Sequence, residues 1–169
     1  MLKHNHGAAV SGVTSEKNLK EFLNKHGRKL LKNKEELSEA GLSSLYRLPV
    51  PDSMKNLDSE QQYHYFLHDG IVPSLRLMIE SKYTKQKGTT EEKIWCDFRK
   101  IKKGVYNNPN GFDLWYIIWG PQALRQPIYA DFEREVKEEK LPVKVLRLES
   151  LAELKPHITQ RIKELNGEL

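Results

Sequence analysis

The sequence predicts one α/β domain, built as a mixed central β-sheet flanked by helices. Its 169 residues, 38% of them hydrophobic and 30% charged, suit a single globular domain with a substantial core. Apolar residues recur at helical spacing in some segments and alternate or run together in others. These segments follow the order helix, three strands, helix, strand, helix, strand, helix. Antiparallel strands followed by helical crossovers form such a mixed sheet.

The N-terminal part is expected to be helical. Residues 1–12 are interpreted as a flexible arm, and Thr14 or Ser15 as the cap of a helix that runs to about His26. Residues at spacings of three and four mark its apolar face: Leu19, Phe22, Leu23 and His26. A second short helix is expected within residues 28–43.

Three strands are expected next. The first covers residues 44–50, and the other two, residues 65–72 and 75–82, form a hairpin around Pro73 and Ser74. Alternation within residues 75–82 places Leu75, Leu77 and Ile79 on one face and Glu80 and Lys82 on the other.

The C-terminal half alternates helices and strands. A capping box at Thr89 opens a helix that ends at Gly104. Residues 114–119 are almost wholly apolar, which indicates a central strand covered on both faces. Another strand is expected at residues 143–148. Apolar residues at helical spacing indicate one helix before and one after that strand: Ile128, Phe132 and Val136, then Leu151, Leu154, Ile158, Ile162 and Leu165.

Composition excludes several classes of protein. No apolar run is long enough to span a bilayer, and the N-terminus lacks the apolar core of a secretory signal. Cys96 is the lone cysteine, so there is no internal disulfide and no zinc-site spacing. We therefore expect a cytoplasmic protein without membrane contact.

Basic residues are concentrated in two blocks. Residues 2–34 hold eight Lys or Arg and two acids, and residues 82–103 hold eight and three, whereas the block between them is acidic. Basic clusters attract polyanions, although lysine-rich helices are also often simply solvated.

The residues that indicate chemistry lie on the expected hairpin. Asp69 and Glu80 supply carboxylates from its two strands, and the Ser81 carbonyl adds a third oxygen. Such a hard oxygen site suits Mg²⁺. Lys82 shares a face with Glu80 and can orient the attacking water beside the ion.

This pattern, Asp69-Gly70 followed after nine residues by Glu80-Ser81-Lys82, resembles the PD-(D/E)XK nuclease superfamily, over roughly residues 14–148. The resemblance implies a restriction-endonuclease-like αβββαβ core. It also implies that Asp69 and Glu80 bind the metal and that Lys82 is catalytic. Glu16, in the preceding helix, matches the accessory acid of some members.

A basic stretch follows the motif and is expected to contact nucleic acid. Lysines and a helix N-terminus, both suited to phosphate, make up this stretch: Lys85, Lys87, Thr89, Thr90 and Lys93. The two threonines open the helix, and Lys93 lies one turn into it.

Two alternatives concern the motif itself. Asp52, in a literal Pro-Asp pair, is a rival for the first acid, but it lies in a loop 28 positions before Glu80. Asp69-Gly70 is also a sequence typical of a hairpin turn. We prefer Asp69, because adjacent hairpin strands bring it near Glu80.

The expected function is Mg²⁺-dependent hydrolysis of DNA phosphodiester bonds, most readily of double-stranded DNA, with Mn²⁺ as a possible substitute. Restriction, repair and junction resolution all fit, and a restriction-type enzyme would act as a homodimer. The alternatives are a non-catalytic nucleic-acid-binding protein on the same scaffold and a small protein–protein adaptor.

Overall fold

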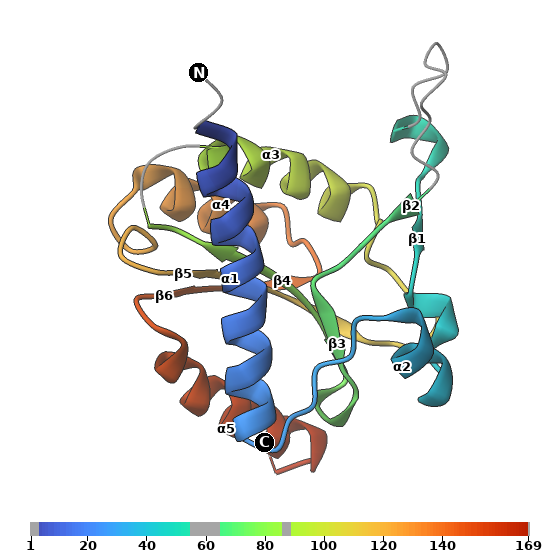
Figure 1. Cartoon of the computed structure of the whole chain (residues 1–169). Coiled ribbons are helices and arrows are strands. Elements are labelled where there is room, and N and C mark those ends of the chain that lie inside the picture. The colour runs from blue at the N-terminus through green and yellow to red at the C-terminus, as the bar shows by residue number, and fades with distance from the viewer. Residues whose placement is uncertain (1–3, 55–64, 86–88, 169) are drawn as a thin grey trace.

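The computed structural model describes residues 4–54, 65–85 and 89–168, and side chains among them except at 4–14 and 89–92. A four-stranded sheet forms its centre, in the order β3-β4-β5-β6 (Figure 1). β3 (Gly70–Val72) pairs antiparallel with β4 (Leu77–Tyr83), whereas β5 (Asp113–Trp119) and β6 (Val143–Leu148) continue the sheet in parallel. The expected mixed α/β architecture is confirmed.

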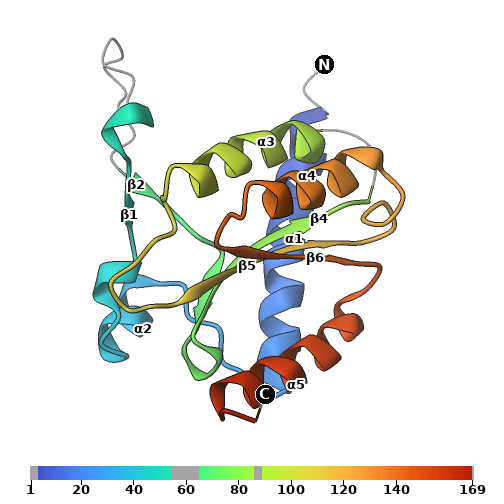
Figure 2. The same ribbon diagram turned by 180° about the vertical axis from the view of Figure 1, so that it is seen from behind.

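Helices cover both faces of this sheet. α3 (Thr89–Lys102) and α4 (Pro127–Glu138) lie on one face, and α1 (His4–Lys25) and α5 (Leu154–Leu165) lie on the other (Figures 1 and 2). Alternate residues of the strands enter two separate cores. Representative members of the α3/α4 core are Met78, Ile94, Tyr116, Ile118 and Phe132. Representative members of the α1/α5 core are Leu19, Leu77, Ile79, Trp115, Ile117 and Ile158.

The C-terminal half follows the sequence prediction closely. β5 is a central strand with its residues buried from Leu114 to Trp119, as its continuous apolar run indicates. β6 spans the predicted residues, and α4 buries Tyr129, Phe132 and Val136. α3 begins at Thr89, as predicted.

The N-terminal predictions need two corrections. α1 begins at His4 rather than at Thr14 or Ser15, so the expected arm is helical from its fourth residue. Helix-favouring Ala8 and Ala9 lie in this stretch, and Ser15 is buried inside the helix instead of capping it. The second helix, α2 (Lys34–Glu39), lies where a short helix was expected and is capped by Asn33.

The first predicted strands are also shorter than expected. Of residues 44–50 only β1 (Leu48–Pro49) is extended, and it pairs with β2 (Tyr65–Phe66) in a separate two-stranded sheet. The chain bends at residues 67–69, so the predicted strand at 65–72 divides between two sheets, β2 and β3. The described residues also form four short 3₁₀ helices: Ser43–Leu45, Asp52–Met54, Pro73–Leu75 and Leu151–Glu153.

The outer edge of β3 is covered by the segment after α1. Leu31 and Ile71 exchange two backbone hydrogen bonds of 2.7 and 2.8 Å, so this segment runs antiparallel to β3. None of the helices in the described part of the chain is both long and apolar enough to cross a membrane.

Packing of this segment requires glycine at position 70. A Cβ atom added at Gly70 would lie 2.3 to 3.0 Å from three side-chain atoms of buried Leu30. We expect Gly70→Ala to lower the free energy of unfolding by about 1–3 kcal/mol, measured by urea denaturation. In a Leu30→Ala background the new methyl group has room, and the same substitution should cost much less. Equal costs in both backgrounds would contradict this steric explanation.

Candidate active site

Three adjacent residues of β4 bring the predicted site together. Glu80 and Lys82 face α3, whereas Ser81 faces α1 and accepts a hydrogen bond from Trp119 Nε1 at 3.2 Å. Glu80 and Ser81 are buried, and Lys82 is partly exposed. The sequence prediction that Glu80 and Lys82 share a face is confirmed.

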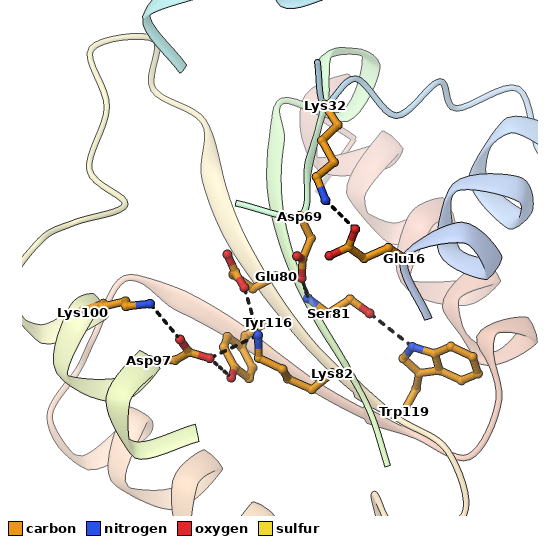
Figure 3. A network of polar contacts seen from close by, with 10 residues as sticks. All are labelled: Glu16, Lys32, Asp69, Glu80, Ser81, Lys82, Asp97, Lys100, Tyr116 and Trp119. Atoms are coloured by element: carbon orange, nitrogen blue, oxygen red, sulfur yellow. Dashed lines mark hydrogen bonds and ion pairs between the residues drawn. The ribbon is translucent and has the colours of Figure 1, made fainter. Parts of the chain in front are cut away.

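Asp69 lies in the bend immediately before β3, rather than within a strand as expected. Its amide donates to the Ile79 carbonyl at 3.0 Å, and its Oδ2 accepts from the Ser81 amide at 2.7 Å (Figure 3). β3 pairs Gly70 with Ile79, and Asp69, just beyond that pair, lies close enough to Glu80 to raise its pKa. The hairpin therefore juxtaposes the two carboxylates, which the sequence prediction required.

The Ser81 carbonyl points to the same edge of the sheet as Asp69. Within a strand, the N–H and C=O groups of one residue point to the same side. The Ser81 amide faces Asp69, and Thr84 bonds to Trp119 of β5, on the opposite side of the strand. The carbonyl therefore faces the space beyond the end of β3, next to the Asp69 carboxylate.

Lys82 connects Glu80 to an acid from α3. Its Nζ lies 3.2 Å from Glu80 Oε2 and 3.4 Å from Oδ2 of Asp97 (Figure 3). Asp97 is buried, accepts a hydrogen bond from the Tyr116 hydroxyl, and lies 3.5 Å from Lys100 Nζ. Glu80 and Asp97 thus hold the ammonium group in one place.

Burial and neighbouring charges change the acidity of these groups. Burial and the adjacent Asp69 raise the pKa of Glu80 to about 8. Burial raises the pKa of Asp69 to about 6, although Lys82 opposes this shift. Burial lowers the pKa of Lys82. The three acids Glu80, Asp97 and Asp69 raise it by more than burial lowers it, so the pKa lies above its ordinary value. Burial raises the pKa of Tyr106, and the neighbouring Glu80 raises it further.

Glu16 reaches the same cluster from α1. Its Oε2 forms an ion pair with Lys32 Nζ, and its carboxyl group lies against Asp69, whose pKa it raises (Figure 3). The structure therefore brings Glu16, Asp69, Glu80 and Lys82 together from three elements separated by up to 66 positions in the chain.

Two carboxyl groups and one backbone carbonyl at this site are the candidate ligands for a divalent cation. In the described residues, no group of three or more His, Cys, Asp and Glu side chains is arranged to hold a metal ion. Asp69 and Glu80 supply two carboxylates, and the Ser81 carbonyl is the third candidate ligand. Mg²⁺ is often bound by one or two carboxylates while it keeps several waters. Two buried like charges with raised pKa values also favour a cation between them.

The alternative first acid lies elsewhere. Asp52 is exposed in a 3₁₀ helix that follows β1. The largest charge effects on the pKa of Glu80 come from Asp69, Lys82 and Asp97. Asp69 therefore lies beside Glu80, and its role as the first acid of the motif stays a prediction.

The predicted nucleic-acid contacts lie around the start of α3. Lys85 is exposed just after β4, and Lys93 is exposed on α3. Thr89 and Thr90 form the first turn of this helix, and their side chains are outside the described part of the structure. Lys87 also lies outside the described residues.

Sequence reasoning missed Asp97, Tyr106 and Tyr116. A signal existed for Asp97, because it lies between Ile94 and Ile101 at helical spacing, on the face that α3 buries. An acid in such a position needs a buried cation or donor. The two tyrosines carried no comparable signal, since buried aromatic residues are common in a core.

Comparisons with protein families, with curated proteins and with solved structures find no match to this chain.

Proposed function

We propose that this protein is a Mg²⁺-dependent endonuclease that hydrolyses DNA phosphodiester bonds. The observation that carries the proposal is the meeting of Asp69 and Glu80 at one edge of β4, with the Lys82 ammonium 3.2 Å from Glu80. Buried acids of raised pKa beside a fixed lysine are typical of catalytic sites.

The order of elements supports the resemblance to PD-(D/E)XK nucleases. α1 is followed by the segment around Leu31, then, after α2 and the separate β1–β2 pair, by the β3–β4 hairpin, and then by α3 and β5. If the Leu31 segment is a reduced first strand, this order corresponds to an αβββαβ core. Asp69 then immediately precedes the second strand, and Glu80 and Lys82 lie on the third.

Asp69, Glu80 and the Ser81 carbonyl would hold the Mg²⁺ ion, or Mn²⁺ in its place. When bound, the ion lowers the pKa of a water molecule and offsets phosphate charge. Lys82 orients the attacking water through its ammonium group. The water oxygen loses a proton and bonds to phosphorus, the bond to the 3′ oxygen breaks, and that oxygen takes up a proton from solvent, so the products carry 5′-phosphate and 3′-hydroxyl ends.

Residues around the site would bind the DNA backbone. Lys85, Lys93 and the N-terminus of α3 lie after β4, and we assign phosphate contacts to them. Glu16 is assigned as an accessory acid, with Lys32 beside it. We further propose double-stranded DNA as the substrate, a cytoplasmic location and, for cleavage of palindromes, a homodimer.

Cleavage assays test this function directly. Supercoiled plasmid, linear duplex and branched DNA are incubated with the protein in Mg²⁺, Mn²⁺ or EDTA. Metal-dependent strand breaks are the expected result. Salt-sensitive DNA binding without cleavage in either metal would instead support the alternative, a non-catalytic nucleic-acid-binding protein on this scaffold.

Asp97 provides a separate test of the lysine's role. Asp97→Asn keeps the size of the side chain and the contact with Tyr116 but removes the charge that holds Lys82. We expect metal-dependent cleavage to fall about 10–100-fold, mainly in kcat, while DNA affinity is retained. Asp97→Glu should restore part of the activity. A variant with wild-type kcat would show that Asp97 only supports the fold.

A further inference from the structure

Lys32 brings an ammonium group to the candidate active site from the side of α1 (Figure 3). It directly follows Leu31, which exchanges two backbone hydrogen bonds with Ile71 of β3. The backbone that carries Lys32 is therefore fixed against the strand that follows Asp69. From there the ammonium group reaches Glu16 Oε2 and forms an ion pair with it.

Two acids of the site are each bound to a lysine, and Asp69 lies between them (Figure 3). Glu80 pairs with Lys82 at 3.2 Å on the side of α3, and Glu16 pairs with Lys32 on the side of α1. In sites with two metal ions, the ions lie about 3.5–4 Å apart. A second ion that close to one held by Asp69 and Glu80 would need Glu16 as a ligand. The Glu16 carboxylate, however, already has the Lys32 ammonium group as its counter-ion.

The charges of the site suit one divalent cation. The cluster contains four carboxyl groups and three ammonium groups: Glu16, Asp69, Glu80 and Asp97, with Lys32, Lys82 and Lys100 (Figure 3). When all of them are ionised, the cluster carries one negative charge. One divalent cation changes this to one positive charge, which a single DNA phosphate balances. A second cation would leave three positive charges in the same small volume, where their mutual repulsion is unfavourable.

We infer that the active site binds a single divalent cation, and that the Lys32 ammonium group takes the place of a second one on Glu16. Asp69, Glu80 and the Ser81 carbonyl remain as the metal ligands. Glu16 then acts as an acid that binds a lysine rather than a metal ion. This inference rests on the proposed function and specifies how many metal ions the nuclease uses.

Mn²⁺ binding without DNA tests this number. Bound ions are counted by electron paramagnetic resonance, because Mn²⁺ loses the sharp signal of the free ion when it binds to a protein. We expect one Mn²⁺ per wild-type chain and two per chain in Lys32→Met. Methionine keeps the apolar part of the side chain and removes its charge. The two side chains of the ion pair are 41% and 40% exposed, so its loss should leave the protein folded, which thermal melting checks.

Matched variants assign the second ion to Glu16. Lys32→Arg keeps the positive charge and should bind one ion, as the wild type does. Lys32→Met combined with Glu16→Gln lacks the carboxylate that the second ion needs, and should also bind one. Lys29→Ala removes an exposed lysine of the same segment and should leave the count at one.

The count in the wild type decides the inference without any variant. Two Mn²⁺ ions per wild-type chain would overturn it. No bound Mn²⁺ would overturn both the inference and the proposed metal site. A single ion in folded Lys32→Met would show that Lys32 does not exclude a second one, and would also overturn the inference.

Plasmid cleavage by the same preparations separates the inference from the proposed function. Metal-dependent cleavage by a wild type that binds two ions would overturn the role of Lys32 and leave the nuclease. One ion in the wild type and two in Lys32→Met, without cleavage in Mg²⁺ or Mn²⁺, would support the role of Lys32 and overturn the nuclease.

Discussion

Replacement of Lys82 with alanine is expected to reduce metal-dependent DNA cleavage by at least about 100-fold. The ammonium group lies between Glu80 and Asp97, where it can orient a water molecule at the proposed metal site. Most of the loss should appear in kcat, because the partly buried lysine contributes little to the binding of the DNA backbone. Rates on plasmid in Mg²⁺, with DNA affinity measured separately, check this result.

A matched control uses Lys155, an exposed lysine of α5. Lys155→Ala removes the same charge from the helix layer on the other face of the sheet, so cleavage should stay within about twofold of the wild-type rate. Removal of Lys82 leaves two buried acids, Glu80 and Asp97, without their cation, which can destabilise the fold. Circular dichroism therefore checks that Lys82→Ala is folded. A folded Lys82→Ala protein that cuts at the wild-type rate would refute the catalytic role of Lys82.

Glu80→Gln is expected to abolish cleavage and yet stabilise the metal-free protein at pH 8. In the folded state, burial and Asp69 raise the pKa of Glu80 to about 8, from an ordinary value of 4.5. Glutamine has the same shape and carries no charge. At pH 8 without metal, we expect the free energy of unfolding to rise on the order of 1–3 kcal/mol.

The direction of the pH effect follows from proton binding. Between pH 4.5 and pH 8 the folded protein holds a proton on Glu80 that the unfolded chain releases. The stability contribution of this group is therefore complete below pH 4.5 and is lost as the pH rises to about 8. Asp69, with its pKa raised from 3.8 to about 6, acts in the same direction. Wild-type stability in EDTA should fall over this range, and that of Glu80→Gln should fall less.

Urea denaturation at pH 5 and pH 8 measures both effects. Mg²⁺ at pH 8 should stabilise the wild type by binding the folded state, and should stabilise Glu80→Gln much less. Glu39→Gln, at an exposed position of α2, should change stability by less than about 0.5 kcal/mol at either pH. If Glu80→Gln destabilises the protein at pH 8, the contact between Glu80 and Lys82 is a structural ion pair and the metal-site interpretation is wrong.

Patterns confined to one element predicted the fold well where that element is long and strongly apolar. The continuous apolar run of β5 and the helical spacing in α4 both report burial of their own segment. Period-two alternation likewise predicted that Glu80 and Lys82 share a face. Short elements were predicted less well. β1 and β2 have two residues each, and their pairing depends on a contact between distant segments rather than on local sequence.

The pairing of Asp69 with Glu80 was predicted from the hairpin, but the conformation of Asp69 was not. Asp69 lies in a bend just before β3 begins at Gly70. The Ser81 amide of β4 therefore has no backbone partner on β3, and it donates to the Asp69 carboxyl group instead. No local pattern reports where a neighbouring strand stops.

The amino-acid sequence alone therefore specified the α/β class, the principal helices and strands, and the acids and lysine of one hairpin. The tertiary structure decided which distant residues join them: Asp97 and Tyr116 around Lys82, and Glu16 and Lys32 beside Asp69. The reason is physical. Periodicity records how one segment meets the core, whereas a site depends on the packing of several segments, which spacing along the chain does not encode.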